Sequence, residues 1–124
     1  RVKTDDAIPY WDYDAPVTKE TPRDVSAASV TASAMIELST MVPDGQKYLD
    51  YAEKILKSLS SDAYLAKVGD NQGFILLHSV GSLPNGSEID TPLNYADYYY
   101  LEALKRFMEL KKLRVENGEL RVIQ

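Results

Sequence analysis

Residues 94–104 read NYADYYYLEAL, and this stretch decides the fold of the 124-residue chain. Its tyrosines, leucines and alanines recur at helical spacing, and Tyr100 and Leu104 lie on one stripe of the predicted helix. Tyr98 and Leu101 take up much of the remaining surface, so the early part of this helix is apolar nearly all round. A helix of this kind is normally covered on every side, and the other helices of the chain look too few to cover it. The sequence therefore predicts a piece of a larger helical assembly.

The segments before this helix are predicted from proline placement and hydrophobic spacing. Residues 1–22 are expected to be extended and irregular, because each proline biases the residue before it away from helix. A first helix should begin at the capping residue Asp24 and run to Leu38, and its many Ala and Ser residues predict close helix neighbours. The turn at 43–45, Pro-Asp-Gly, is expected to use glycine for an unusual backbone dihedral. A second, amphipathic helix should occupy residues 46–59.

The C-terminal end is predicted to leave the helical pattern. The tyrosine helix should extend to about residue 112. The pair Asn117-Gly118 is the preferred sequence of a two-residue type I′ turn, and it predicts a hairpin that sets Val115 opposite Leu120 and Leu113 opposite Val122. No internal repeat of a helical array is visible. The expected fold class is all-α with a small C-terminal β-hairpin.

Composition excludes several classes of function. Fourteen Lys and Arg residues face nineteen Asp and Glu residues, giving a formal charge of −5, and no basic stripe carries interleaved aromatic residues, so nucleic acid is not an expected partner. The absence of cysteine excludes disulfides and zinc–thiolate sites. No run approaches the roughly 18 apolar residues of a membrane span, so no membrane partner is expected. The compartment, cytoplasmic or periplasmic, stays open.

The only histidine, His78, ends a short apolar run over residues 74–78 that is expected to be extended and buried. One interpretation is a histidine hydrogen-bonded beside the core. The other is a polar group that faces a ligand cavity at the end of a buried element. A metal site is not expected, because one histidine offers no paired spacing and no cysteine can assist.

Three aspartates and one loop complete the candidates. Asp12 and Asp14 flank a tyrosine and could act as paired carboxylates or as simple caps of nearby amides. Asp97 is expected to cap amides or bind a tyrosine hydroxyl rather than to act as an acid or base, because buried carboxylates need partners. The loop at 82–87 carries hydroxyl, amide and glycine backbone donors. Such a loop suits contacts with a sugar, and it equally suits a plain connection.

Three stretches resemble the last third of the unsaturated glucuronyl hydrolases, glycoside hydrolase family 88. The first is PYWDYDAP at 9–16, followed by PRDVSAA at 22–28. The second is HSV at 78–80, and the third is EID at 88–90 followed by the tyrosine run at 94–104. The resemblance implies an (α/α)6 barrel much longer than this chain. Residues 1–124 would then form the C-terminal segment of that single catalytic domain and supply its closing helices.

The resemblance also implies a reaction. Enzymes of this family remove the terminal 4,5-unsaturated uronic acid from oligosaccharides produced by polysaccharide lyases. An aspartic acid protonates the C4=C5 double bond, water adds at C5, and the product rearranges to release the sugar. The family uses a pair of aspartates for this acid–base work. Both aspartate motifs lie upstream of the region matched here, so no catalytic residue is expected in this chain.

The binding loop is the part of the site that the resemblance places in this chain. Relatives that handle sulfated sugars carry Ser-x-x-Ser-x-Lys there, and the matching positions are Ser82, Asn85 and Ser87. Only the first serine agrees, and the missing lysine removes a cation that would pair with sulfate. The expected substrate is therefore unsulfated or differently sulfated. The expected substrate-binding residues are His78, Ser82, Asn85 and Ser87, with no metal and no cofactor.

Two hypotheses follow. In the first, the chain is the C-terminal part of an unsaturated glucuronyl hydrolase whose partner is an unsaturated oligosaccharide, and the chain alone is inactive. In the second, it is a non-catalytic helical module that binds protein through exposed aromatic surfaces. In either case the uncovered helix faces are expected to favour a homo-oligomer.

Overall fold

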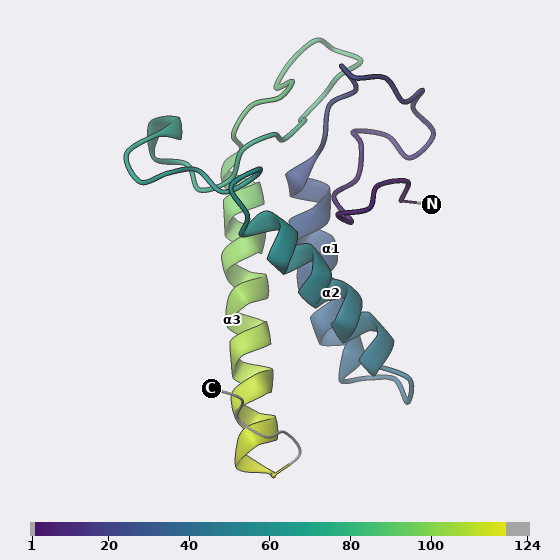
Figure 1. Cartoon of the computed structure of the whole chain (residues 1–124), viewed down its shortest axis with the longest axis vertical. Helices are drawn as coiled ribbons and strands as arrows, with labels where there is room; N and C mark the ends of the chain where they lie inside the picture. The colour runs from purple at the N-terminus through teal and green to yellow at the C-terminus, as the bar shows by residue number, and fades with distance from the viewer. Residues whose placement is uncertain (1, 119–124) are drawn as a thin grey trace.

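The structure is a computed structural model, and it describes residues 2–118. The helices are α1 (Val25–Ser39), α2 (Gln46–Leu59) and α3 (Asn94–Glu116), with a 3₁₀ turn at Asn71–Gly73 (Figure 1). Within this described part, β pairing is confined to isolated bridges and forms no strand. The described residues before α1 are irregular, as predicted. The predicted helical class is therefore confirmed for residues 2–118.

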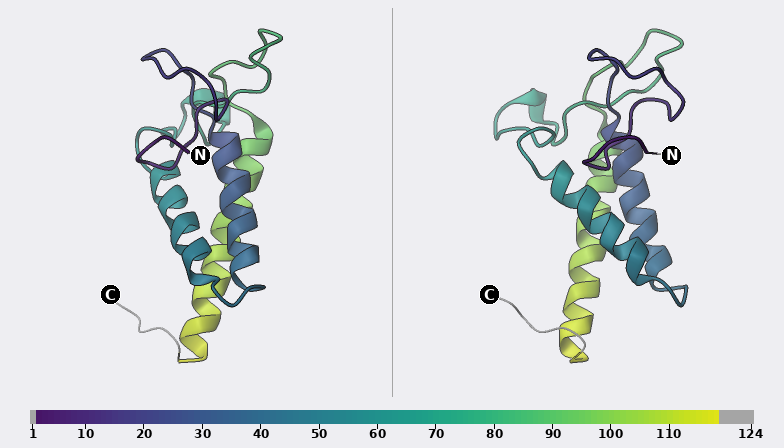
Figure 2. Two further views of the ribbon diagram at one scale, coloured as in Figure 1. Left: turned by 90° about the vertical axis from the view of Figure 1, so that its right-hand side faces the viewer. Right: turned by 45° about the vertical axis from the view of Figure 1, so that its right-hand side comes forward.

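Helix α1 is the centre of the packing. It contacts both α2 and α3, whereas α2 and α3 contact each other little, and the arrangement is visible from two further directions in Figure 2. Ala28, Ser29, Ala32 and Ser33 are almost completely buried along α1. Small side chains at a contact allow helix axes to approach closely. The prediction of close neighbours for this helix is confirmed.

The start of α1 and the turn before α2 have different physical causes. Asp24 caps α1, because its carboxylate accepts a hydrogen bond from the backbone N–H of Ser26. Gly45 has ordinary helical dihedrals, with φ −60° and ψ −24°, so the prediction that it supplies an unusual dihedral is wrong. A Cβ atom at Gly45 would lie 1.9 Å from the carbonyl oxygen of Ser39. Glycine is needed there for close approach.

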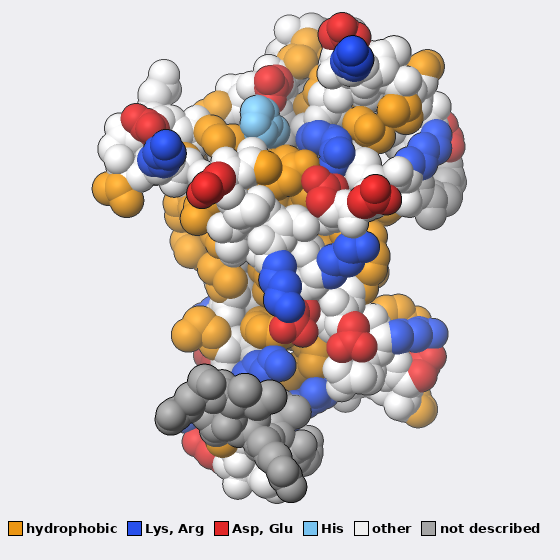
Figure 3. All heavy atoms as spheres, viewed as in Figure 1, with side chains coloured by type: hydrophobic (Ala, Val, Ile, Leu, Met, Phe, Trp, Pro, Cys, Tyr) orange, Lys and Arg blue, Asp and Glu red, His pale blue; other side chains and the backbone are white. Residues whose placement is uncertain are grey.

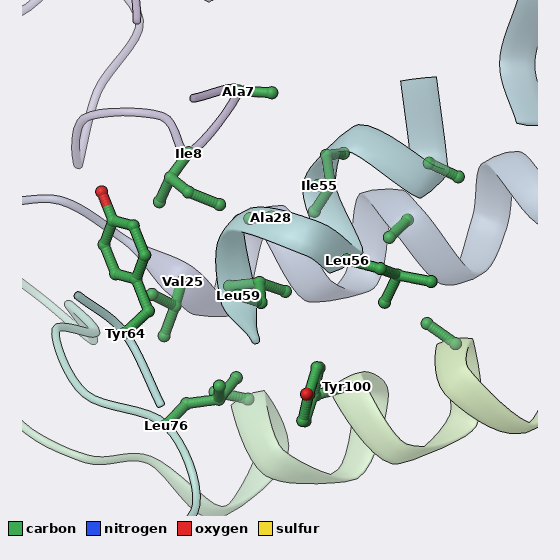
Figure 4. Close-up of a cluster of buried hydrophobic side chains, with 14 of the residues drawn as sticks. Ala7, Ile8, Val25, Ala28, Ile55, Leu56, Leu59, Tyr64, Leu76 and Tyr100 are labelled. Atoms are coloured by element: carbon green, nitrogen blue, oxygen red, sulfur yellow. The ribbon is translucent and has the colours of Figure 1, made fainter. Parts of the chain in front are cut away.

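The core lies where the three helices meet the N-terminal segment (Figure 4). Ile8, Leu59 and Leu76 have no exposed side-chain surface, and Tyr100 is 5% exposed. Full burial of a large aliphatic side chain contributes about 1.5–3 kcal/mol. Since Ile8 and Leu76 belong to irregular segments, the core fastens these segments to the helices.

Among residues 2–118, helix α3 is covered on one side only. Ala96, Tyr100 and Ala103 are buried against the other helices. Tyr98 is 62% exposed and Leu101 is 51% exposed on the opposite side, so the described residues leave this apolar surface open. The prediction that the helices of the chain cannot cover the tyrosine helix is confirmed. None of the described helices has the length and apolar character needed to cross a membrane.

The C-terminal hairpin prediction fails in its first strand. Leu113 and Val115 are part of α3, and the backbone N–H of Asn117 bonds to the carbonyl oxygens of both residues. These carbonyl groups therefore complete the helix and do not form a strand ladder. The predicted second strand, with Leu120 and Val122, lies outside the described residues.

Candidate functional site

The candidate residues lie in loops at one end of the helices. The segment before α1 and the connection from residue 78 to 93 arch over the same end in Figures 1 and 2. Asp97, in the first turn of α3, accepts hydrogen bonds from the backbone N–H groups of Ile75 and Leu76 at 2.8 and 2.9 Å. Asp97 is held by partners, as a partly buried carboxylate needs, but it does not cap its own helix, since α3 has no side-chain cap. Its partners belong to the run that leads to His78.

The other side of this run is held by α1. The backbone N–H of Val25 donates to the carbonyl oxygen of His78 at 3.0 Å. The Asp24 carboxylate, beyond capping its own helix, accepts from the backbone N–H of Val80 at 3.2 Å. The backbone on both sides of His78 is therefore attached to helix termini. Of the run at 74–78, only Leu76 is fully buried, so the expectation of a buried segment holds in part.

His78 is held by its side chain as well. Its Nδ1 atom lies 2.6 Å from a carboxylate oxygen of Asp90, and its ring meets the Tyr64 ring edge-on, with 6.1 Å between centroids. The backbone φ angles of His78 and Asp90 are +69° and +48°, a region that non-glycine residues rarely occupy. Such conformations persist only where the surroundings enforce them.

A cavity of about 550 Å³ lies beside this pair. Four charged side chains line it, and their formal charges cancel: Lys19, Glu20, Arg23 and Asp90. Its remaining lining residues are Thr21, Pro22, Ala63, Tyr64, His78 and Ile89. The histidine, in pale blue, is visible at the surface next to orange hydrophobic side chains in Figure 3. His78 is thus hydrogen-bonded and placed at a cavity, and its role in ligand binding stays a prediction.

A polar network fixes one wall of the cavity. Arg23 donates to Asp6 at 2.8 Å and to the Tyr64 hydroxyl at 3.2 Å, and that hydroxyl donates to Asp6 at 2.6 Å. Burial opposes the charge of Asp6, but the hydrogen bonds from Tyr64 and Arg23 outweigh it and lower the pKa of that carboxyl group. Burial and the bond to Asp6 together raise the pKa of the Tyr64 hydroxyl. The network locks the Tyr64 ring against His78.

The candidate loop residues form a separate group. Ser82 and Ser87 pair through two backbone hydrogen bonds of 3.1 Å, and the Asn85 amide donates to the Ser82 hydroxyl at 2.9 Å. Ser82 is partly exposed, and Asn85 and Ser87 are exposed. The structure therefore gathers these three residues, but they do not belong to the lining of the cavity that contains His78.

Two further results concern residues outside the predicted site. The Asp12 carboxylate accepts from the backbone N–H of Asp14 at 2.7 Å, which is the loop-capping arrangement rather than a bare carboxylate pair. Sequence reasoning missed Asp90 and Tyr64 as partners of His78. Twelve and fourteen positions separate them from the histidine along the chain, and no spacing rule links residues of irregular loops at those distances.

The chain is similar to curated unsaturated glucuronyl hydrolases. No family model matches it. It is 49% identical over 105 residues to an unsaturated glucuronyl hydrolase of Formosa agariphila, covering 85% of this chain and 26% of that protein. It is 31% identical over 106 residues to an unsaturated glucuronyl hydrolase of Bacillus sp. strain GL1, covering 82% of this chain and 28% of that protein. The chain spans about a quarter of the length of these relatives.

The chain is also similar to solved structures of unsaturated glucuronyl hydrolases. An unsaturated glucuronyl hydrolase described as specific for heparin is 66% identical, with a TM-score of 0.85, covering 88% of this chain and 29% of that one. A variant of the Streptococcus agalactiae enzyme complexed with dGlcA-GalNAc6S is 32% identical, with a TM-score of 0.74, covering 82% of this chain and 28% of that one.

Proposed function

This chain belongs to the unsaturated glucuronyl hydrolases, glycoside hydrolase family 88, and from this premise we propose that it supplies the closing helices of an (α/α)6-barrel catalytic domain. Residues 1–124 would be the C-terminal segment of that domain and would form one wall of its sugar site. The observation that carries the proposal is the TM-score of 0.85, at 66% identity, to a crystal structure of this enzyme class. The uncovered side of α3 supports it, because a barrel would place further helices there.

We propose that the complete enzyme removes a terminal 4,5-unsaturated uronic acid by acid-assisted hydration of the C4=C5 double bond. The proton donor would be an aspartate outside this chain. This chain would contribute binding groups: His78 beside the cavity, and Ser82, Asn85 and Ser87 in the loop above the helices. The hydroxyl and amide groups of that loop are partly or fully exposed, as sugar-binding groups must be. The comparisons do not favour the alternative of a non-catalytic module.

The proposed substrate is a heparin-type unsaturated disaccharide. The support comes from the relative of 66% identity that is described as specific for heparin. The loop at 82–87 has no lysine, so it offers no cation to a sulfate group. A disaccharide with no sulfate at the sugar facing this loop is therefore expected to bind better than one that carries sulfate there.

Two measurements on the 124-residue chain test this function. Titration with unsaturated heparin disaccharides, followed by amide NMR, should shift the signals of His78 and of the loop at 82–87. A control titration with maltose, which has no unsaturated uronic acid, should leave them unchanged. An absorbance assay of the double bond should show no turnover, because the proposed proton donor is absent. Turnover by the chain alone, or equal shifts with maltose, would contradict the proposal.

We also propose that the isolated chain associates with a second copy of itself. Its exposed α3 surface carries Tyr98, Leu101 and Met108, which are 62%, 51% and 68% exposed. Exposed apolar patches on a soluble protein commonly mark an interface. In the complete barrel the same surface would face neighbouring helices.

A further inference from the structure

We infer that Asp90 is a positioning residue. When the His78 ring is neutral, Asp90 holds it in the tautomer that carries hydrogen on Nδ1, so that Nε2 presents a lone pair to a donor hydroxyl group of a sugar in the cavity. The tautomer follows from this chain alone. The identity of the ligand rests on the proposed function.

The tautomer follows from the partner on Nδ1. A neutral imidazole carries hydrogen on one ring nitrogen and accepts at the other. An ionised carboxylate accepts hydrogen bonds and cannot donate them. The Nδ1 atom of His78 lies 2.6 Å from Oδ1 of Asp90, so Nδ1 must be the donor. In the neutral ring Nε2 then has no hydrogen, and the only ring-nitrogen hydrogen bond of His78 to residues 2–118 is the one from Nδ1.

The geometry around the pair is built to keep this arrangement. The histidine ring is braced by Tyr64, which is itself bonded to Asp6 and Arg23. Ser79 and Thr91, the residues that follow His78 and Asp90, pair through two backbone hydrogen bonds of 3.1 and 2.9 Å. Left-handed backbone conformations at both His78 and Asp90 cost free energy. These contacts keep both residues in those conformations and bring their side chains together.

The chemistry of the cavity indicates what meets Nε2. An unprotonated nitrogen accepts from a donor and repels the lone pairs of carboxylate or sulfate oxygens. The charges of the lining cancel, with Lys19 and Arg23 against Glu20 and Asp90, and the Arg23 guanidinium is already bonded to Asp6. The cavity therefore offers no net attraction to an anion. The group that fits is the hydroxyl face of a sugar ring.

Nitrogen NMR of the 124-residue chain tests the tautomer directly. His78 is the only histidine, so a two-bond proton–nitrogen spectrum of the ring contains a single imidazole. At pH 8 the wild-type spectrum should show a protonated Nδ1 and an unprotonated Nε2. Asp90→Asn leaves the size of the side chain unchanged, and asparagine also tolerates the left-handed backbone conformation. It should move the ring toward the Nε2-protonated tautomer or a mixture of the two.

The matched control is Glu20→Gln. It removes the same charge from the same cavity lining without touching a bond to His78, and it should leave the tautomer unchanged. Asp90→Glu should restore the wild-type pattern at least in part. A wild-type ring protonated on Nε2, or an unchanged tautomer in Asp90→Ala, which has no side-chain acceptor for Nδ1, would overturn the inference, and neither result depends on sugar binding.

The ligand is tested by two probes, a nonsulfated unsaturated uronyl disaccharide and inorganic sulfate. The disaccharide should shift the Nε2 signal of His78, and sulfate should not. Asp90→Asn should weaken disaccharide binding by about 3- to 10-fold, the range expected for one hydrogen bond. A larger Nε2 shift with sulfate, or disaccharide binding that leaves Nε2 unmoved, would overturn the hydroxyl assignment. Absence of disaccharide binding at every residue would refute the proposed function and leave the tautomer result standing.

Discussion

Two aspartates fasten irregular segments of this molecule to its helices, and a third joins irregular segments to one another. Asp24 reaches from the start of α1 to Val80, and Asp97 reaches from the start of α3 to Ile75 and Leu76. Asp6, in the N-terminal segment, accepts from Arg23, just before α1, and from Tyr64, in the connection after α2. Hydrogen bonds to ionised groups are stronger than those between neutral groups. Single carboxylates therefore decide where the candidate site residues lie.

Removal of the Asp97 carboxylate should loosen the run that carries His78. Asp97→Ala leaves two backbone N–H groups without their acceptor, which should lower the free energy of unfolding by about 2–4 kcal/mol. Urea unfolding followed by circular dichroism measures this. Asp62→Ala, at an exposed loop position, should cost less than about 0.5 kcal/mol. Equal effects of the two substitutions would contradict the role given to Asp97.

The Asp6 network should make stability depend on acid pH. The folded-state pKa of Asp6 is lowered from the model-compound value of 3.8. The unfolded state therefore binds the proton more tightly. The stabilisation is fully present above the unfolded pKa and is lost as pH falls through the folded pKa. For this reason the free energy of unfolding of the wild type, measured with urea, should fall as the pH is lowered from 5 to 3.

The corresponding variant is Asp6→Asn. At pH 6 it should lower the free energy of unfolding by about 1–2 kcal/mol, near the lower end for a charged hydrogen-bonded group because water screens the partly exposed pair. Its deficit relative to wild type should shrink at pH 3. Asp62→Asn serves as the control for charge removal. A deficit that is constant with pH would exclude Asp6 as the titrating group.

At the residue scale the sequence reveals local chemistry better than distant contacts. The cap at Asp24 and the loop contact between Asp12 and Asp14 could be predicted, because each involves residues two positions apart. The pairing of His78 with Asp90 could not, because it depends on how two irregular segments cross. The roles of His78, Ser82, Asn85 and Ser87 in sugar binding stay predictions.

At the element scale, α1 and α2 form a helical hairpin whose turn depends on one missing side chain. Gly45 lies against the backbone at Ser39, the last residue of α1. Because the clash involves backbone atoms, a rotamer change cannot relieve it. The α1–α2 connection is therefore sensitive to any residue larger than glycine.

Gly45→Ala should destabilise the protein by about 1–3 kcal/mol, the usual cost of overpacking. This is the opposite of the gain that alanine normally brings at a position with helical dihedrals. Thermal unfolding followed by circular dichroism measures the change. Lys54→Ala, on the exposed side of α2, should leave stability nearly unchanged. A stabilised Gly45→Ala variant would show that the Ser39 contact relaxes freely.

Helix boundaries were more predictable than the C-terminal end. The predicted bounds of α2 match the structure, because its amphipathic period is regular and a turn precedes it. The hairpin prediction rested on the turn preference of Asn117-Gly118. Leu113 and Val115 instead continue α3, since a helix already in progress gains a hydrogen bond for each added residue. Turn preference alone did not outweigh that propagation.

At the scale of the whole molecule, the uncovered side of α3 governs behaviour in solution. The expected self-association should appear in sedimentation velocity as an average mass that rises with protein concentration. Replacing Leu101 and Met108 by glutamine removes apolar surface from an exposed position and should shift the protein toward monomer without loss of helical signal. Lys54→Gln and Lys57→Gln, both on α2, form the control pair. A wild-type protein that stays monomeric at every concentration would contradict the prediction.

The uncovered surface could be predicted from the sequence. The prediction only requires comparing the number of apolar helix faces with the number of helices available to cover them. Tyr98 and Leu101 were assigned to the side left over, and both are exposed. The cavity beside His78 was not predictable, because its lining comes from four separate parts of the chain. The organisation of the complete barrel remains a proposal.

The central place of α1 has a consequence for the order in which the chain folds. Its contacts with α2 are close in sequence, whereas its contacts with α3 require closure of the long connection over residues 60–93. Closing this connection costs conformational entropy before the favourable contacts between the helices can form. The α1–α2 pair should therefore form early and α3 should dock last. In pulsed hydrogen exchange during refolding, amides of α3 should gain protection after those of α2.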